Sequence, residues 1–171
     1  TNVVLAAFVT AQARLHLYSE LEKLNERVLY FDTDSIFFVT SATDTYYPKL
    51  GDFLGQFTNE IDPREGTHIT EFVSAGPKNY AYKTNYDIAH CTVKGFTLNY
   101  IASLKISFES IKEIVMNDQS NKINVEQQKF NRNKNNWTIE TELNKKLYGF
   151  VYDKRILFND LTTLPYGYKF W

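Results

Sequence analysis

Two carboxylates one residue apart, Asp32 and Asp34, are the side chains of this 171-residue chain whose types and spacing best suit chemistry. They stand between two apolar runs, residues 28–29 and 36–39, so a strand that turns and returns would hold both acids at the tip of a hairpin. Oxygen ligands of this kind suit Mg²⁺ or Mn²⁺, which leave other positions to water and substrate phosphates. The spacing therefore indicates metal-dependent phosphoryl transfer.

The two acids could share one metal site. Along an extended strand, Asp32 and Asp34 would point to one face with Cα atoms roughly 6 to 7 Å apart. With a further carboxylate from elsewhere, two ions roughly 3.5 to 4 Å apart would activate an attacking hydroxyl and stabilise a leaving pyrophosphate. We expect Thr33 and Ser35 to hold the turn through side-chain to backbone hydrogen bonds. The alternative is a pair of acids that only cap a solvated turn, and a bare Asp-x-Asp favours that alternative.

The elements around the carboxylates are expected to position them. Residues 3–24 predict a core helix that leads into the hairpin, and Asn2 can cap its start. Its expected buried face consists of apolar residues at spacings of three and four, namely Val4, Phe8, Ala11, Leu15, Tyr18 and Leu21. Residues 28–31 and 36–40 predict the two strands. A second helix is expected from residue 47 or 48 to about residue 61, with Leu50, Phe53, Leu54, Phe57 and Ile61 on one face.

A second hairpin is expected downstream. Residues 68–74 and 79–84 read as strands joined through Ala75, Gly76 and Pro77, and residues 89–94 add a strand. One amphipathic helix is expected over residues 98–115, with Lys105 and Lys112 turned away from its apolar stripe. Residues 117–136, rich in Asn, Gln and Lys, predict a long loop. Strand-like segments are expected over 137–143 and 147–158, followed by an aromatic turn over 164–171.

Composition and charge limit the class of protein. With 43% hydrophobic residues the chain can bury a core, and no apolar run approaches the roughly 20 residues that span a bilayer, so we expect no membrane partner. A single cysteine, Cys91, fits a reducing, intracellular compartment, nucleus or cytoplasm, without requiring one. Residues 1–71 hold five basic and eleven acidic side chains, a net charge of −6, whereas residues 72–171 carry +5. The second half suits a polyanion, although solvated surface lysines explain the same asymmetry.

The longer motif around the carboxylates favours a metal site over a solvated turn. Tyr30 to Ser35, Tyr-x-Asp-Thr-Asp-Ser between two apolar strands, resembles motif C of family B DNA polymerases. Lys78-Asn79-Tyr80, after Gly76-Pro77, resembles their Lys-x-Tyr motif, and the helix carrying residues 11–15 is similar to the helix that enters motif C. The strings 153–155 and 163–168 resemble the C-terminus of the protein-primed branch of self-synthesising DNA transposons, viruses and linear plasmids.

The resemblance implies a role for each matching residue. Asp34 is the implied ligand of the catalytic metals, with Asp32 as its partner and Tyr30, Thr33 and Ser35 as support of the motif. Lys78 and Tyr80 would position the primer terminus, the first as a point charge for phosphate and the second as a rigid ring near sugar or base. The implied cofactors are two Mg²⁺ or Mn²⁺ ions. The implied partners are a DNA primer-template, dNTP and a terminal protein primer, and residues that bind the nucleotide are unknown.

The resemblance implies part of an α+β polymerase. Residues 1–90 would be the C-terminal part of the palm, an antiparallel sheet with packed helices. Residues 91–171 would be the thumb and tail, which close on duplex phosphates. The motif A carboxylate and the motif B lysine have no counterpart in the chain. We therefore expect a fragment of a longer DNA-directed DNA polymerase, inactive alone. There are two alternatives: a DNA-binding descendant without chemistry, and a different metal-dependent phosphotransferase or nuclease. A reverse transcriptase fits less well, because its motif would place the two acids adjacent, whereas Thr33 separates these.

Overall fold

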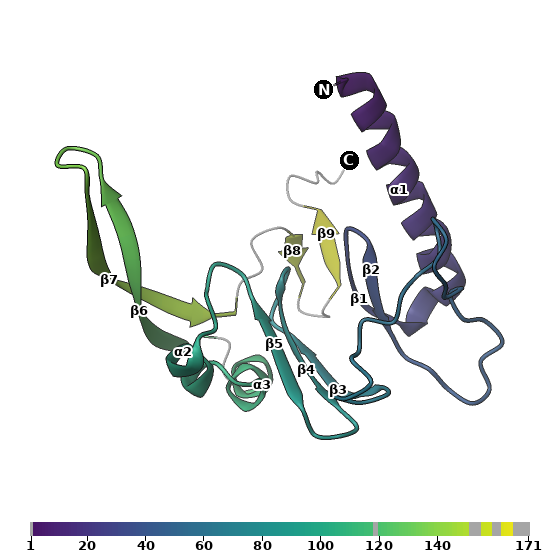
Figure 1. The fold of residues 1–171 in the computed structure, drawn as a ribbon. Coiled ribbons are helices and arrows are strands. Elements are labelled where there is room, and N and C mark those ends of the chain that lie inside the picture. The colour runs from purple at the N-terminus through teal and green to yellow at the C-terminus, as the bar shows by residue number, and fades with distance from the viewer. Residues whose placement is uncertain (1, 118–119, 151–154, 159–161, 166–171) are drawn as a thin grey trace. The chain divides into compact units, whose positions relative to one another are not determined.

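The computed structural model describes residues 2–117, 120–150, 155–158 and 162–165, and the chain forms two compact units, Thr1–Ile61 and Asp62–Trp171 (Figure 1). Helices and small antiparallel sheets occur together, which agrees with the expected α+β class. The boundary between the units comes earlier in the chain than residue 90, which lies inside the strand β5 (Ala89–Val93). The assignment of palm and thumb stays a prediction. No helix in the described part of the chain has both the length and the hydropathy needed to cross a membrane.

The helix α1 (Val3–Leu24) has the predicted bounds, but its predicted buried face is wrong. The side chain of Asn2 caps it, because its Oδ1 accepts hydrogen bonds from the backbone N–H groups of Val4 and Leu5. The buried residues are Leu17, Glu20 and Leu24, all in the C-terminal half, while most of the predicted stripe is exposed. Within its own unit, only this end of α1 is covered, so the rest of the apolar face has nothing to pack on.

The carboxylate of Glu20 links the buried end of α1 to the loop that contains Tyr46. Glu20 accepts hydrogen bonds from Lys23 Nζ at 2.7 Å and from the hydroxyl of Tyr46. Burial raises the pKa of Glu20, but these two hydrogen bonds outweigh burial and the net pKa lies below its ordinary value. The charged form is thus the one that the folded unit stabilises, and it links the helix to the loop that follows the first hairpin.

The strands β1 (Val28–Asp32) and β2 (Ser35–Phe38) form the predicted hairpin, and Arg27 closes its open end. The Arg27 guanidinium donates to the carbonyl oxygens of Val39 at 3.0 Å and Tyr46 at 2.8 Å, and pairs with Asp44 at 3.0 Å. The backbone N–H of Val39 also donates to the Arg27 carbonyl at 2.8 Å. One cation therefore holds both strands and the loop after them.

The helix predicted from residue 47 to about 61 is wrong. This segment is a loop with one isolated parallel bridge, between Leu50 and Phe57. Gly55 has a φ of +86°, a left-handed conformation that ends any helix. The apolar residues that imitated a helical face are largely exposed, Leu54 and Phe53 most of all.

The second unit is built on a three-stranded antiparallel sheet, β3 (Ile69–Ser74), β4 (Asn79–Thr84) and β5, in sequence order. These strands match the predicted ones. Val73, Ala81 and Val93 contribute their side chains to the core of the unit. Two short strands, β8 (Arg155–Leu157) and β9 (Thr163–Pro165), pair separately.

The single helix predicted over residues 98–115 is two helices, α2 (Tyr100–Lys105) and α3 (Phe108–Met116) (Figure 1). Ser107 separates them, because its side chain accepts from the N–H of Ser110 and starts a new helix with a capping box. α3 packs against the sheet with Phe108, Ile111 and Ile114 buried. Ion pairs of 2.5 Å join this helix to the sheet, Glu109 to Lys83 and Lys112 to Glu71.

The predicted loop over residues 117–136 is also wrong, since most of it is the strand β6 (Lys122–Asn133). It pairs with β7 (Thr138–Gly149) over twelve residues of each strand. At the base of this hairpin, Val125 and Tyr148 enter the same core as the sheet and α3. The distal half projects away from the sheet and both helices (Figure 1).

We expect Arg27→Met to lower the free energy of unfolding by about 1–3 kcal/mol, because it leaves Asp44 and two carbonyl oxygens without their charged partner. Urea unfolding followed by circular dichroism measures the change. Arg64→Met is the matched control: Arg64 pairs with Asp62 at 2.5 Å but its side chain is exposed, so the midpoint should not move. Equal shifts for both variants would contradict the role of Arg27.

Candidate metal and nucleic-acid site

Asp32 and Asp34 lie at the tip of the β1–β2 hairpin, where the turn is as tight as predicted. Asp32 pairs with Ser35 as the last rung, and the backbone N–H of Asp34 donates to the carbonyl of Asp32 at 2.6 Å. Thr33, between the acids, has a φ of +54°, which is unusual for a β-branched residue. The segment from Asp32 to Asp34 is therefore not an extended strand, and the predicted same-face spacing does not apply.

The two carboxylates differ in their surroundings. The Thr33 hydroxyl donates to Asp32 Oδ1 at 3.0 Å, and the Ser35 hydroxyl donates to the Asp32 carbonyl at 3.1 Å. Ser35 thus makes the predicted bond to the backbone, while Thr33 bonds the side chain of Asp32. Asp34 is exposed and its carboxylate accepts no hydrogen bond or ion pair from the described residues. Asp32 is held in place, and Asp34 is open to a cation.

The donor set fits one hard cation better than two. Two carboxylates with water and phosphate oxygens match what Mg²⁺ takes in proteins. In residues 2–117 and the shorter described segments, however, no three His, Cys, Asp or Glu side chains gather into a group that could hold a metal. A second ion would need a carboxylate from elsewhere.

Lys78 lies in the turn between β3 and β4, also in a left-handed conformation, with a φ of +56°. The backbone fixes this turn: the N–H of Asn79 donates to Gly76 at 3.0 Å, and the N–H of Lys94 donates to the Lys78 carbonyl at 2.9 Å. The Lys78 side chain is exposed. An exposed lysine thus stands in a turn that the backbone holds by hydrogen bonds.

Tyr80 is the second residue of β4. It pairs with Ser74 on β3 and Thr92 on β5, and its half-buried ring stacks on Phe72 with centroids 5.9 Å apart. Lys78 and Tyr80 are therefore brought together on one hairpin. Asp32 and Asp34 are brought together on another hairpin, in the first unit.

Asn79, between the two motif residues, is a buried residue of the turn that the sequence motif does not specify. Its side chain is 5% exposed, and its Nδ2 donates to the Ala75 carbonyl at 3.2 Å. Asn79 Oδ1 and the hydroxyl of Tyr148, which is 2% exposed, both lack a well-formed hydrogen bond within the described residues. Both residues line a cleft of about 260 Å³ together with Pro77, Lys94 and Phe96. The base of the β6–β7 hairpin thus lies against the turn that carries Lys78.

The strand β6 is the element that sequence reasoning missed, whereas the strand-like segment expected over residues 137–143 lies largely in β7. The polar composition of β6 predicts a loop, although Ile123, Val125 and Gln127 alternate inward and signal a strand. The strings at 153–155 and 163–168 that resemble the protein-primed branch lie largely among residues that the structure does not describe.

Comparison of the chain with protein-family models, with curated proteins and with solved structures gave no match.

Tyr148 gives a pH-dependent test of this region. Burial raises its pKa to about 12, and the nearby Asn79 amide opposes part of the shift. An unfolded tyrosine titrates near pH 10, so the stability that Tyr148 contributes is complete below pH 10 and is lost as the pH rises towards 12. Tyr148→Phe should keep the urea midpoint at pH 8 and lessen its fall between pH 10 and 12. Tyr86 is exposed, so the urea midpoint of Tyr86→Phe should fall with pH as that of the parent does. An equal fall of the midpoint in Tyr148→Phe would refute the assignment of this pH dependence to Tyr148.

Proposed function

We propose that this chain is part of a DNA-directed DNA polymerase of family B and supplies one side of its metal-dependent nucleotidyl-transfer site. The observation that carries the proposal is the tight hairpin of Tyr30 to Ser35, which presents Asp32 and Asp34 at its tip between two apolar strands. The rigid turn with Lys78 and the neighbouring Tyr80 supports it. The protein-primed branch is the finer part of the proposal and rests on the tail strings.

Each residue has a distinct role in this proposal. Asp34, which is exposed to solvent, would ligate Mg²⁺ or Mn²⁺. Asp32, oriented by Thr33, would be its partner on the same side of the metal site. The bound metal would polarise phosphate oxygens of the dNTP. Lys78 would contact a phosphate near the primer terminus and Tyr80 would pack against sugar or base. A third carboxylate, supplied by a segment outside this chain, would be needed for two ions.

A DNA-binding module without chemistry is the second candidate. It is favoured by the absence, among the described residues, of a third carboxylate near the acidic turn. Under this alternative the acids would only shape the turn, and binding would rest on the second unit.

A Mn²⁺ titration of the chain followed by electron paramagnetic resonance separates the two candidates. We expect one weak site, and at least tenfold weaker binding in Asp34→Asn and in Asp32→Asn, because each loses an anionic oxygen ligand. Asp52→Asn, an exposed acid of the same unit, is the control and should bind like the parent. Equal binding by the parent and Asp34→Asn would remove the metal site and favour the module without chemistry.

Primer extension in Mg²⁺ tests the chemistry in a longer polymerase chain that contains this segment. Asp34→Ala should abolish extension and leave DNA binding nearly intact, whereas Lys78→Ala should weaken retention of the primer terminus. Extension at the parent rate by Asp34→Ala would exclude the assigned role. A normal footprint for Lys78→Ala would exclude that residue from the site.

A further inference from the structure

Five lysines of the basic second half are held by contacts within the fold. The lysines of the sheet and α3 pair with Glu109 and Glu71, as described, and Lys145 pairs with Glu126 at 2.9 Å. Lys105 donates to the Asn124 carbonyl at 3.1 Å, and Lys146 donates to the Gly95 carbonyl. These side chains are not a free basic surface for duplex phosphates.

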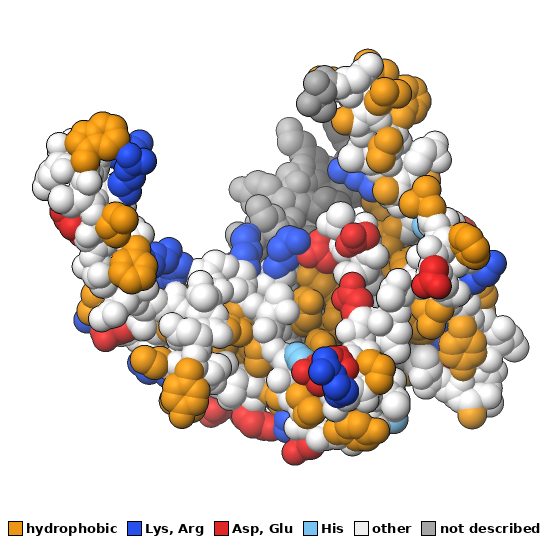
Figure 2. All heavy atoms as spheres, in the orientation of Figure 1, with side chains coloured by type: hydrophobic (Ala, Val, Ile, Leu, Met, Phe, Trp, Pro, Cys, Tyr) orange, Lys and Arg blue, Asp and Glu red, His pale blue; other side chains and the backbone are white. Residues whose placement is uncertain are grey.

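Three cations of the distal β6–β7 hairpin are different. Lys129, Arg132 and Lys134 make no ion pair with any carboxylate of the described residues. Figure 2 shows hydrophobic and basic side chains together at the far end of this hairpin. Lys94 after the sheet and Lys122 at the hairpin base are exposed single cations, whereas the distal hairpin gathers three cations beside exposed rings.

The register separates the two faces of the hairpin. Arg132 pairs with Ile139 and Phe130 with Thr141, so these side chains share one face. The acids lie on the opposite face, where Asn133 Nδ2 donates to Glu140 at 3.0 Å and Asn131 donates to Glu142. The face with the arginine and the phenylalanine is thus free of carboxylates near the tip.

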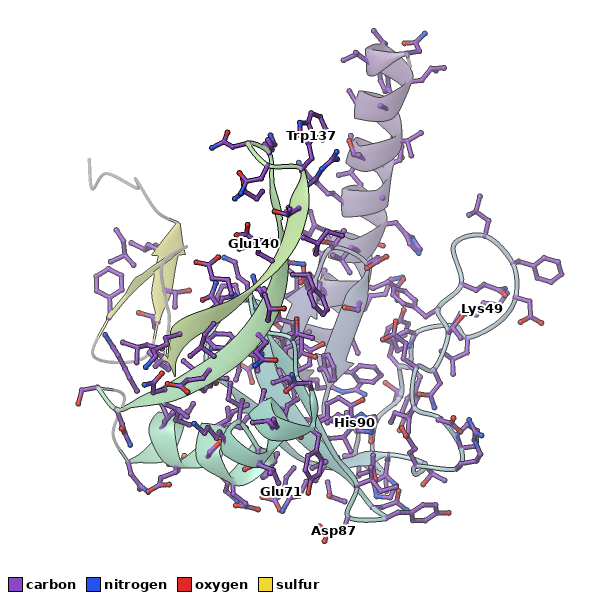
Figure 3. All side chains as sticks on the ribbon, turned by 60° about the vertical axis from the view of Figure 1, so that its left-hand side comes forward. Lys49, Glu71, Asp87, His90, Trp137 and Glu140 are labelled. Atoms are coloured by element: carbon purple, nitrogen blue, oxygen red, sulfur yellow. The ribbon has the colours of Figure 1, made fainter. Side chains whose placement is uncertain are left out.

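Exposed aromatic rings complete this face. Phe130 is 82% exposed and Trp137, in the turn at the tip (Figure 3), is 76% exposed. Trp137 has a φ of +57°, and Asn133 Oδ1 fixes the turn by accepting from the N–H of Asn135 at 3.0 Å. The Arg132 guanidinium lies over the Trp137 ring, 4.9 Å from its centroid. We call Phe130, Arg132 and Trp137 the tip platform.

Exposed aromatic rings beside a cationic side chain are suited to bind unpaired bases. Base stacking on an aromatic side chain is tolerant of sequence, and arginine adds a cation–π contact and a phosphate partner. Three cations are few for duplex binding through the backbone alone. We propose that the tip platform binds single-stranded nucleic acid, with bases on Trp137 and Phe130 and a phosphate at Arg132. The inference rests on the proposed function only in taking nucleic acid as the partner.

Titration of the chain with a twelve-nucleotide oligothymidine tests the proposal, with Trp171→Phe as the background so that fluorescence reports on Trp137. We expect quenching on binding and a slope of log affinity against log salt no steeper than about −2, since at most three cations meet phosphates. Trp137→Asn and Phe130→Ala should each weaken binding by about tenfold, read by fluorescence anisotropy of a labelled oligonucleotide. Asn tolerates the left-handed backbone, so the first variant removes the ring and keeps the turn.

The controls separate stacking from other contacts. Trp137→Phe should bind within about threefold of the parent. Tyr100→Ala removes an equally exposed ring, 77% on α2, and should change nothing. Parent-like binding by Trp137→Asn, or tighter binding of a duplex of the same length, would overturn the proposal. Asp34→Asn should keep oligothymidine binding, so loss of the metal site and loss of the tip platform are distinguishable.

Discussion

Antiparallel pairing between strands that follow one another in sequence is the constraint on which the described structure depends. Each sheet of the described residues is made in this way, and local turns close the β1–β2, β3–β4, β4–β5 and β6–β7 pairs. Three of those turns carry the candidate functional side chains, and each holds a non-glycine residue in a left-handed conformation: Thr33, Lys78 and Trp137. At such a position the turn sets the direction of the Cα–Cβ bond.

The two units are stabilised in different ways. Around the acidic hairpin the ordering contacts are polar: Arg27 ties strand ends and loop together, and Glu20 ties α1 to the same loop through Tyr46. The second unit has a conventional core in which the sheet, α3 and the hairpin base meet. Five of its lysines pair or bond within that architecture, so a positive balance of charge alone says little about where a polyanion would bind.

Sequence reasoning succeeded where the signal is local. Asp-Thr-Asp-Ser and Gly-Pro-Lys-Asn close their hairpins at the predicted places, because turn chemistry acts over a few residues. It failed where the outcome depends on packing. The apolar spacing after residue 47 imitates a helix that Gly55 prevents, and the exposed stripe of α1 shows that periodicity does not reveal which part of a face is covered. The polar β6 strand was missed because cross-strand pairing, rather than hydrophobicity, sustains its distal half.

The length of the β6–β7 ladder sets a distance scale. Twelve paired residues at about 3.3 Å each make an arm of roughly 40 Å, slightly more than the 34–36 Å of one turn of B-form DNA. On the proposed function, an arm of this length would span about twelve base pairs of a duplex lying alongside it. The tip platform and the hairpin base, which lies against the turn that carries Lys78, are thus far apart on one rigid ladder.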